Sequence, residues 1–178
     1  MNPILKSIIQ KKRRDFEELS AKQRIPEHAL DGVRLGRSIR YHQGGDPARV
    51  MDLYCPTTVQ TPTPVIINIH GGGLITGSKD FNRHFCINLC KMGFIVFSVE
   101  YRLCPEVTFF QQLEDIYAAM NHIDSMIPEL KGDPGYCFMV VTVPVPCLRC
   151  TQLRSRETPN WPERQAPGPA TWRSGRSA

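Results

Sequence analysis

The chain contains a segment, VIINIHGGG from Val65 to Gly73, in which a run of β-branched residues leads directly into His70 and three glycines. An unbroken apolar run that ends in turn residues is typical of a strand covered on both faces of a sheet. Three successive glycines leave the backbone N–H groups accessible to a ligand, and glycine adopts positive φ angles readily. Three glycines alone could simply mark a loop, but the preceding strand and His70 favour a turn that binds a ligand.

The segments around this strand alternate between strand and helix patterns. Strand-like pieces on either side of Gln43-Gly44-Gly45-Asp46-Pro47 predict an antiparallel hairpin. Buried strands that then alternate with helices predict an α/β fold, in which a mostly parallel sheet carries helices on both faces. Ligands bind at the carboxyl ends of such strands, where the glycine turn lies. The expected elements are hairpin strands 33–41 and 49–54, helices 82–91 and 110–123, and buried strands 65–69, 94–100 and 136–140.

The N-terminal region is predicted to be an amphipathic helix over residues 3–20, with Ile4, Leu5, Ile8 and Ile9 at helical spacing. The basic run Lys11–Arg14 is assigned to its solvated face, and a nucleic-acid or targeting role is the weaker alternative. We therefore divide the chain into an N-terminal amphipathic segment (residues 1–32), an α/β domain (33–140) and a disordered tail (141–178).

Composition limits the class of protein. Apolar residues make up 41% of the chain, and none of the apolar runs approaches the roughly 18 residues of a membrane span. Basic residues follow the first apolar stretch instead of preceding it, unlike a signal peptide, so we expect a cytoplasmic protein whose seven cysteines are reduced. Of the net charge of +5, the tail carries +4, from six Arg and two Glu in residues 141–178. Nucleic acid is not an expected partner.

Two cysteine pairs raise the question of a metal. Cys86 and Cys90 lie one helical turn apart, but they lack further ligands nearby and are interpreted as small core residues. Cys147 and Cys150 form a lone C-x-x-C without a second ligand pair, and the incidental interpretation is favoured. We expect neither a metal nor a cofactor.

Several motifs together resemble the hormone-sensitive-lipase-like carboxylesterases of the α/β-hydrolase superfamily. The resemblance rests on His70-Gly71-Gly72-Gly73 with Gly77-Ser78, on YRLCPE at residues 101–106 (commonly YRLAPE in that family), and on Gly132-Asp133-Pro134 before a strand. It extends from about residue 33 to Val140, so residues 33–140 would be a partial α/β-hydrolase domain, and the N-terminal segment (residues 1–32) resembles the family's variable cap. It implies the N-terminal half of an α/β-hydrolase fold, truncated after the third buried strand, and a small ester as the substrate of the intact enzyme.

The same resemblance implies the roles of the glycine turn. The backbone N–H groups of Gly72 and Gly73 would form one side of an oxyanion hole, while His70 and Gly71 shape the turn. The family's nucleophile lies in a G-x-S-x-G elbow directly after the third buried strand, and this motif is absent from the chain. No residue is assigned a catalytic role: His84 and His122 are expected to face solvent or pack, and Ser78 to cap a helix or form a hydrogen bond within the loop.

The tail has the character of an out-of-frame translation. From Val141 onward, proline and arginine are frequent, and such a segment buries too little apolar area to offset its chain entropy. The codons of Val140 to Pro146 are GTN, ACN or CCN, and a one-base shift is compatible with Gly-Asp-Ser-Ala-Gly-Ala, the missing elbow. We therefore predict a one-base shift near codon 140.

Two expectations follow for the chain as printed. It should be inactive as an esterase, since the resemblance supplies half of an oxyanion hole without a triad; a non-catalytic binding or regulatory protein with an anion at Gly71–Gly73 is the alternative. The third buried strand should also present an unpaired edge, through which copies of the chain could associate non-specifically.

Overall fold

The computed structural model describes residues 2–22, 25–59 and 62–141. A five-stranded sheet forms the centre of the described chain, in the order β1-β2-β4-β3-β5. The first strands pair antiparallel, β1 with β2 and β2 with β4, whereas β3 is parallel to both β4 and β5. The elements are α1 (Pro3–Lys22), η1 (Glu27–Leu30), β1 (Val33–Arg40), β2 (Val50–Pro56), β3 (Thr63–Ile69), η2 (Lys79–Asn82), α2 (Arg83–Lys91), β4 (Ile95–Val99), α3 (Phe109–Met126) and β5 (Gly132–Val141). The predicted hairpin, parallel sheet and flanking helices are thus confirmed.

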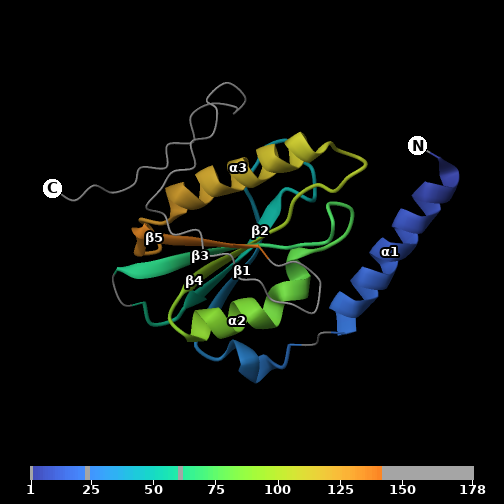
Figure 1. Ribbon diagram of the computed structural model, residues 1–178. Coiled ribbons are helices and arrows are strands. Elements are labelled where there is room, and N and C mark those ends of the chain that lie inside the picture. Colours follow the sequence, from blue (N-terminus) through green and yellow to red (C-terminus); the bar gives the residue numbers. More distant parts are fainter. Residues whose placement is uncertain (1, 23–24, 60–61, 142–178) are drawn as a thin grey trace.

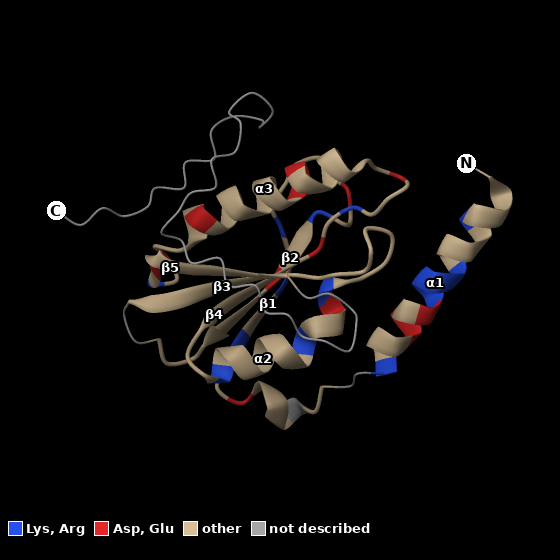
Figure 2. Ribbon diagram, viewed as in Figure 1, with Lys and Arg blue, Asp and Glu red and all other residues tan. Residues whose placement is uncertain are grey.

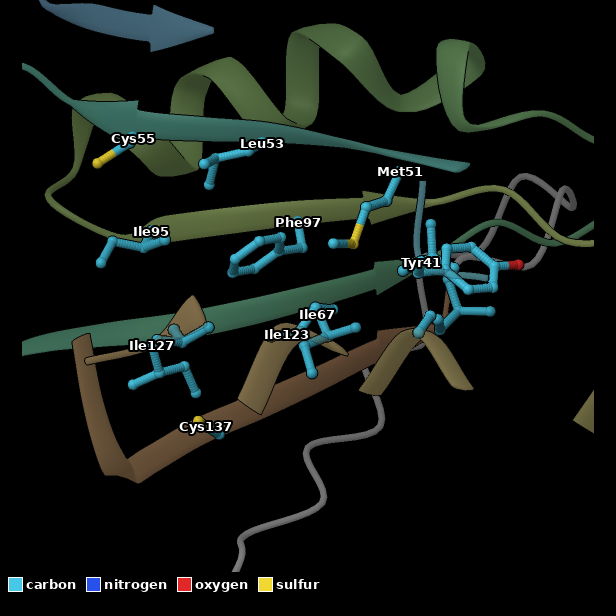
Figure 3. Close-up of a cluster of buried hydrophobic side chains, with 14 of the residues drawn as sticks. Tyr41, Met51, Leu53, Cys55, Ile67, Ile95, Phe97, Ile123, Ile127 and Cys137 are labelled. Carbon is cyan, nitrogen blue, oxygen red and sulfur yellow. The ribbon is translucent and has the colours of Figure 1, made fainter. Parts of the chain in front are cut away.

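The strand β3, between β4 and β5, is buried on both faces because helices cover both sides of the sheet (Figure 1). Successive side chains of a strand point to opposite faces. Val65, Ile67 and Ile69 therefore join the core beneath α3, which also contains Phe97, Ile123 and Ile127 (Figure 3). Ile66 joins a second core beneath α2, with Val96, Cys86, Ile87 and Cys90. The unbroken apolar run in the sequence reflects these two cores.

The last described strand starts earlier than predicted, and its burial is partial, in line with the unpaired edge expected for it. β5 begins at Gly132, before the expected start at Tyr136, and only part of it is covered. Tyr136 is 62% exposed and Val141 is 42% exposed, whereas Cys137 and Val140 are buried. Among the described strands, β5 is paired with β3 alone and forms the edge of the sheet. A strand with one neighbour has no second strand to cover its far edge, which explains the partial burial of β5.

The N-terminal helix is confirmed, but most of its apolar side chains are not covered. α1 lies at the margin of the fold instead of over a face of the sheet (Figure 1). Ile9 is buried, and the ring of Phe16 lies 4.6 Å from that of Phe81, whereas Ile4, Leu5 and Ile8 are exposed. None of the described helices is long and apolar enough to cross a bilayer.

Candidate oxyanion-binding turn

The glycine turn follows β3 at the carboxyl edge of the sheet. The carbonyl oxygen of Gly72 accepts hydrogen bonds from the backbone N–H of Thr76 at 3.0 Å and from its hydroxyl at 2.8 Å. Gly72 and Gly73 both have positive φ angles, 140° and 60°. Neither of their N–H groups donates to a residue in the described ranges. Both donors are therefore unpaired within the described residues; Gly73 is exposed, whereas Gly72 is buried.

Close backbone approach explains two of the glycines. A Cβ atom on Gly72 would lie 1.8 Å from the carbonyl oxygen of Thr76. One on Gly77 would lie 2.1 Å from the carbonyl oxygen of Gly71 and 2.4 Å from Nδ1 of His70. Gly77 thus closes the loop against its beginning, which gives a physical reason for the Gly77-Ser78 part of the motif.

His70 lies beneath the turn and is almost completely buried, with 2% exposure. Its ring stacks on Tyr101 at a centroid distance of 4.3 Å, and Nε2 lies 3.0 Å from a carboxylate oxygen of Glu100. The hydroxyl of Tyr101 donates to the carbonyl oxygen of His70 at 2.7 Å, and burial raises the pKa of this phenol to about 12. The hydroxyl therefore remains a donor at neutral pH.

Glu100 connects the turn to the loop that follows it. Its second carboxylate oxygen accepts the backbone N–H of Lys79 at 2.9 Å, and its backbone carbonyl accepts the hydroxyl of Tyr41 at 2.7 Å. Neither Glu100 nor Tyr101 was predicted to act at the site. Their position, directly after the buried strand β4, was the available signal, because functional groups gather at the carboxyl ends of parallel strands.

A buried polar layer supports this region on the α2 face of the sheet. The amide of Asn68 donates to the hydroxyl of Ser98 at 3.0 Å, and that hydroxyl donates to the carbonyl of Lys79 at 3.1 Å. The ammonium of Lys79 lies 3.0 Å from Asp52 and 3.2 Å from Asp80. Buried charges are stable only when they are paired and hydrogen-bonded. The side chain of Lys79 therefore stays beside Asp52 and Asp80.

The carboxylate of Asp80 is perturbed by opposing effects. Burial, the largest effect, raises its pKa, but hydrogen bonds from Arg83 and Lys79 and the charges of these cations together bring the pKa below its ordinary value. Asp80 is therefore ionised throughout the neutral range. Ser78 accepts the backbone N–H of Asp80 at 3.1 Å and caps η2, as predicted for this serine.

The YRLCPE segment is anchored on α3. Arg102 forms two bonds of 2.7 Å to the carboxylate of Asp115, which also accepts Arg49 at 2.9 Å. The side-chain amide of Gln112 donates to the carbonyl oxygens of Leu74 and Arg102, both at 2.9 Å. Since Leu74 directly follows the glycines, α3 fixes the far end of the turn.

The basic run of α1 does not lie wholly on a solvated face, so that prediction is wrong for Arg13. Its side chain is 23% exposed and donates to the backbone carbonyls of Ile75 and Cys104, in the two loops beside the turn. Lys11, Lys12 and Arg14 are exposed, as predicted. Arg13 is thus a third residue near the turn, after Glu100 and Tyr101, that was not predicted, because its contacts span more than 60 residues.

The other candidate residues do not gather at the turn. His84 is exposed on α2 and His122 is half-buried on α3, on opposite faces of the sheet. Cys86 and Cys90 are buried core residues, as predicted, and burial raises the pKa of both thiols to about 12. No group of three potential metal ligands occurs in the described part of the chain. Cys147, Cys150 and the suggested reading-frame change lie outside the described residues.

Comparison with known proteins accords with this arrangement. The BD-FAE domain family matches residues 51–140, just over half of the chain, and includes the glycine turn, β4 and α3. The chain belongs to the BD-FAE family. The resemblance to hormone-sensitive-lipase-like carboxylesterases is thereby confirmed, and so is the partial α/β-hydrolase fold.

Similar solved structures are esterases. Esterase B from Lactobacillus rhamnosis is 30% identical with a TM-score of 0.64, and the match covers 78% of this chain and 42% of that one. A bacterial heroin esterase is 28% identical with a TM-score of 0.61, over 75% of this chain and 42% of that one.

A relative from Arabidopsis thaliana, described as a probable isoprenylcysteine alpha-carbonyl methylesterase, is 30% identical over 107 residues. The match covers 60% of this chain and 25% of the relative. This BD-FAE chain therefore spans less than half of the length of each of these relatives.

Proposed function

We propose that this chain carries the oxyanion-binding side of a carboxylic-ester hydrolase that acts through a serine nucleophile. The observation that carries the proposal is the pair of N–H groups at Gly72 and Gly73, which have no acceptor among the described residues and lie at the carboxyl edge of the sheet. An ester carbonyl becomes a tetrahedral oxyanion during acyl transfer, and each backbone donor aimed at that oxygen contributes about 3 kcal/mol. His70 and Gly71, held by Glu100, Tyr101 and Gly77, would keep the donors in place.

We further propose that the 178-residue chain has no esterase turnover of its own. The printed sequence has no G-x-S-x-G motif, and β5 is followed by TVPVP instead of a serine elbow. Sites without their triad retain only about 10³–10⁴-fold acceleration over water, and that remainder comes from an oxyanion hole and a binding site. The sequence has only one side of such a hole, so even this remainder is not expected. Purified chain should hydrolyse p-nitrophenyl acetate and butyrate at the buffer rate. Turnover that a single substitution in this chain abolishes would contradict the proposal.

The coding DNA supplies the positive test of the same function. We expect a one-base shift near codon 140 to restore Gly-Asp-Ser-Ala-Gly. The protein translated in that frame should hydrolyse short-chain p-nitrophenyl esters, and alanine in place of the restored serine should remove the activity. A coding sequence that no single-base shift converts into this elbow would rule the shift out.

A non-catalytic protein that binds an anion at Gly71–Gly73 is the second candidate, and the same two unpaired N–H groups favour it. Titration of ¹⁵N-labelled chain with acetate would separate the candidates. Saturable shifts of the Gly72 and Gly73 amides at millimolar acetate, together with an intact reading frame, would favour binding; linear shifts would count against it.

We also propose that copies of the chain associate through the edge of β5. Among the described strands this edge lacks a partner on one side, and Tyr136 and Val141 are exposed on it. Exposed edges of this kind template pairing between chains. Light scattering after gel filtration should show concentration-dependent oligomers, and a monomer at all concentrations would contradict the proposal.

A cytoplasmic location remains a prediction.

A further inference from the structure

Arg13 joins the N-terminal helix to both loops beside the glycine turn. Its Nε–H donates to the carbonyl oxygen of Ile75 at 2.8 Å, and one Nη group donates to the carbonyl oxygen of Cys104 at 2.8 Å. The guanidinium also contacts the carboxylate of Glu106 at 2.7 and 3.0 Å. The rigid fork of an arginine suits such simultaneous contacts.

The contact with Ile75 acts on a peptide unit that also holds the turn. The carbonyl of Ile75 and the N–H of Thr76 belong to one planar peptide group. Arg13 binds the carbonyl end of this group, and the N–H end donates to the carbonyl of Gly72 at 3.0 Å. Fixing one end of a planar unit fixes the direction of the other.

The carbonyl of Gly72 in turn shares a peptide plane with the N–H of Gly73. A bond that orients this carbonyl therefore sets the direction of the Gly73 N–H. The described contacts form a continuous path from the guanidinium of Arg13 through the Ile75–Thr76 peptide to the Gly72–Gly73 peptide. This path ends on one of the two backbone donors of the turn.

The loop beyond the turn is fixed at the same place. Leu74 accepts the backbone N–H of Cys104 at 2.9 Å, and Arg13 binds the carbonyl of that same Cys104. The N-terminal helix bears charged side chains along its length (Figure 2). Lys11, Lys12 and Arg14 are exposed, and among the basic residues of the run Arg13 alone forms side-chain hydrogen bonds or ion pairs within the described residues.

We propose that Arg13, held on α1, is a positioning residue that orients the Gly73 N–H toward an oxyanion. The inference rests on the proposed function of the turn. The ion pair with Glu106 contributes less than the two carbonyl contacts, because Glu106 is 61% exposed and exposed pairs are weak. Arg13→Ala should therefore loosen the turn far more than Glu106→Gln does.

Amide hydrogen exchange of the full ¹⁵N-labelled chain tests this inference. In Arg13→Ala we expect the N–H groups of Thr76 and Cys104 to exchange about tenfold faster, while amides in the middle of β3 and β4 keep their rates. The Gly73 amide resonance should also shift. Arg13→Lys should fall between, since an ammonium cannot reproduce the fork. Arg14→Ala, a change of the exposed neighbour, is the matched control and should leave all these amides unchanged.

Unchanged exchange at Thr76 and Cys104 in Arg13→Ala, or equal acceleration in Arg14→Ala, would overturn the inference. Acceleration confined to α1 would also overturn it, because it would mean that Arg13 only fastens the helix. If Arg13→Ala does not fold, Arg13→Lys carries the test by the same criteria. Exchange does not depend on turnover, so failure here leaves the ester chemistry standing, and failure of the ester chemistry leaves the exchange result standing.

Discussion

Replacing Gly72 by alanine tests whether close backbone approach shapes the turn. The φ angle of Gly72 is 140°, a conformation that costs a non-glycine residue roughly 1–3 kcal/mol. The added Cβ would also lie 1.8 Å from the carbonyl oxygen of Thr76, and forcing extra atoms into packed structure costs about 1–3 kcal/mol. Together these costs predict a loss of about 4 kcal/mol from a domain stability of roughly 5–15 kcal/mol.

Gly73 provides the matched control within the same turn. Its φ angle is 60°, and a Cβ there would meet nothing within 4 Å. Gly73→Ala should therefore lose only the left-handed backbone cost of about 1 kcal/mol. Both changes add one methyl group to neighbouring residues, so the difference between them measures the Thr76 contact together with the greater backbone strain at Gly72.

Urea unfolding followed by circular dichroism would measure the difference. With a slope of about 2 kcal/mol/M, Gly72→Ala should lower the midpoint by about 2 M and Gly73→Ala by about 0.5 M. Equal midpoints for the two variants would refute the reasoning, because they would show that the loop relieves the Thr76 contact at no cost.

Three further outcomes follow from the charges and thiols. Asp115→Asn should lower the free energy of unfolding in urea by about 3 kcal/mol, because it leaves the guanidinium groups of Arg49 and Arg102 unpaired. Glu114→Gln, at an exposed position on the same helix, should change it by less than about 0.5 kcal/mol. Similar losses in the two variants would refute this reasoning. The folded-state pKa of Asp80 is depressed, so the contribution of Asp80 to the free energy of unfolding is complete above the ordinary carboxyl pKa of about 4 and is lost as the pH falls below it. The free energy of unfolding of Asp80→Asn should therefore depend less on pH below about pH 4 than that of the unchanged chain. At pH 8, peptide mapping should find Cys104 alkylated well before Cys86, whose buried thiol has a pKa of about 12; faster reaction at Cys86 would show that α2 opens.

The predictions that succeeded rest on local patterns. The helices and strands were predictable because residue spacing within each segment reports the period of its own backbone. Burial of Cys86 and Cys90 followed from their place on one face of a helix. The unpaired edge of β5 followed from the family resemblance, whereas its start at Gly132 did not, because Gly132-Asp133-Pro134 has the composition of a turn.

The residues that support the turn were harder to predict for a related reason. Glu100 and His70 are 30 positions apart, and the contact between Arg13 and Cys104 spans 91 positions. No periodicity within a segment encodes such a pair. The sheet order brings β3 and β4 together, and only then do His70 and Glu100, which follow directly after these strands, come within hydrogen-bond distance.

The sequence by itself determined the alternation of strands and helices, the glycine turn after β3 and the family of the chain, because these reside in short contiguous motifs. Only the tertiary structure decided how the turn is held. The stack of His70 on Tyr101, the carboxylate of Glu100 and the reach of Arg13 from α1 depend on where separate elements meet in space. Backbone N–H groups carry no sequence signature of their own, so the direction of the Gly73 N–H is a property of the packed fold.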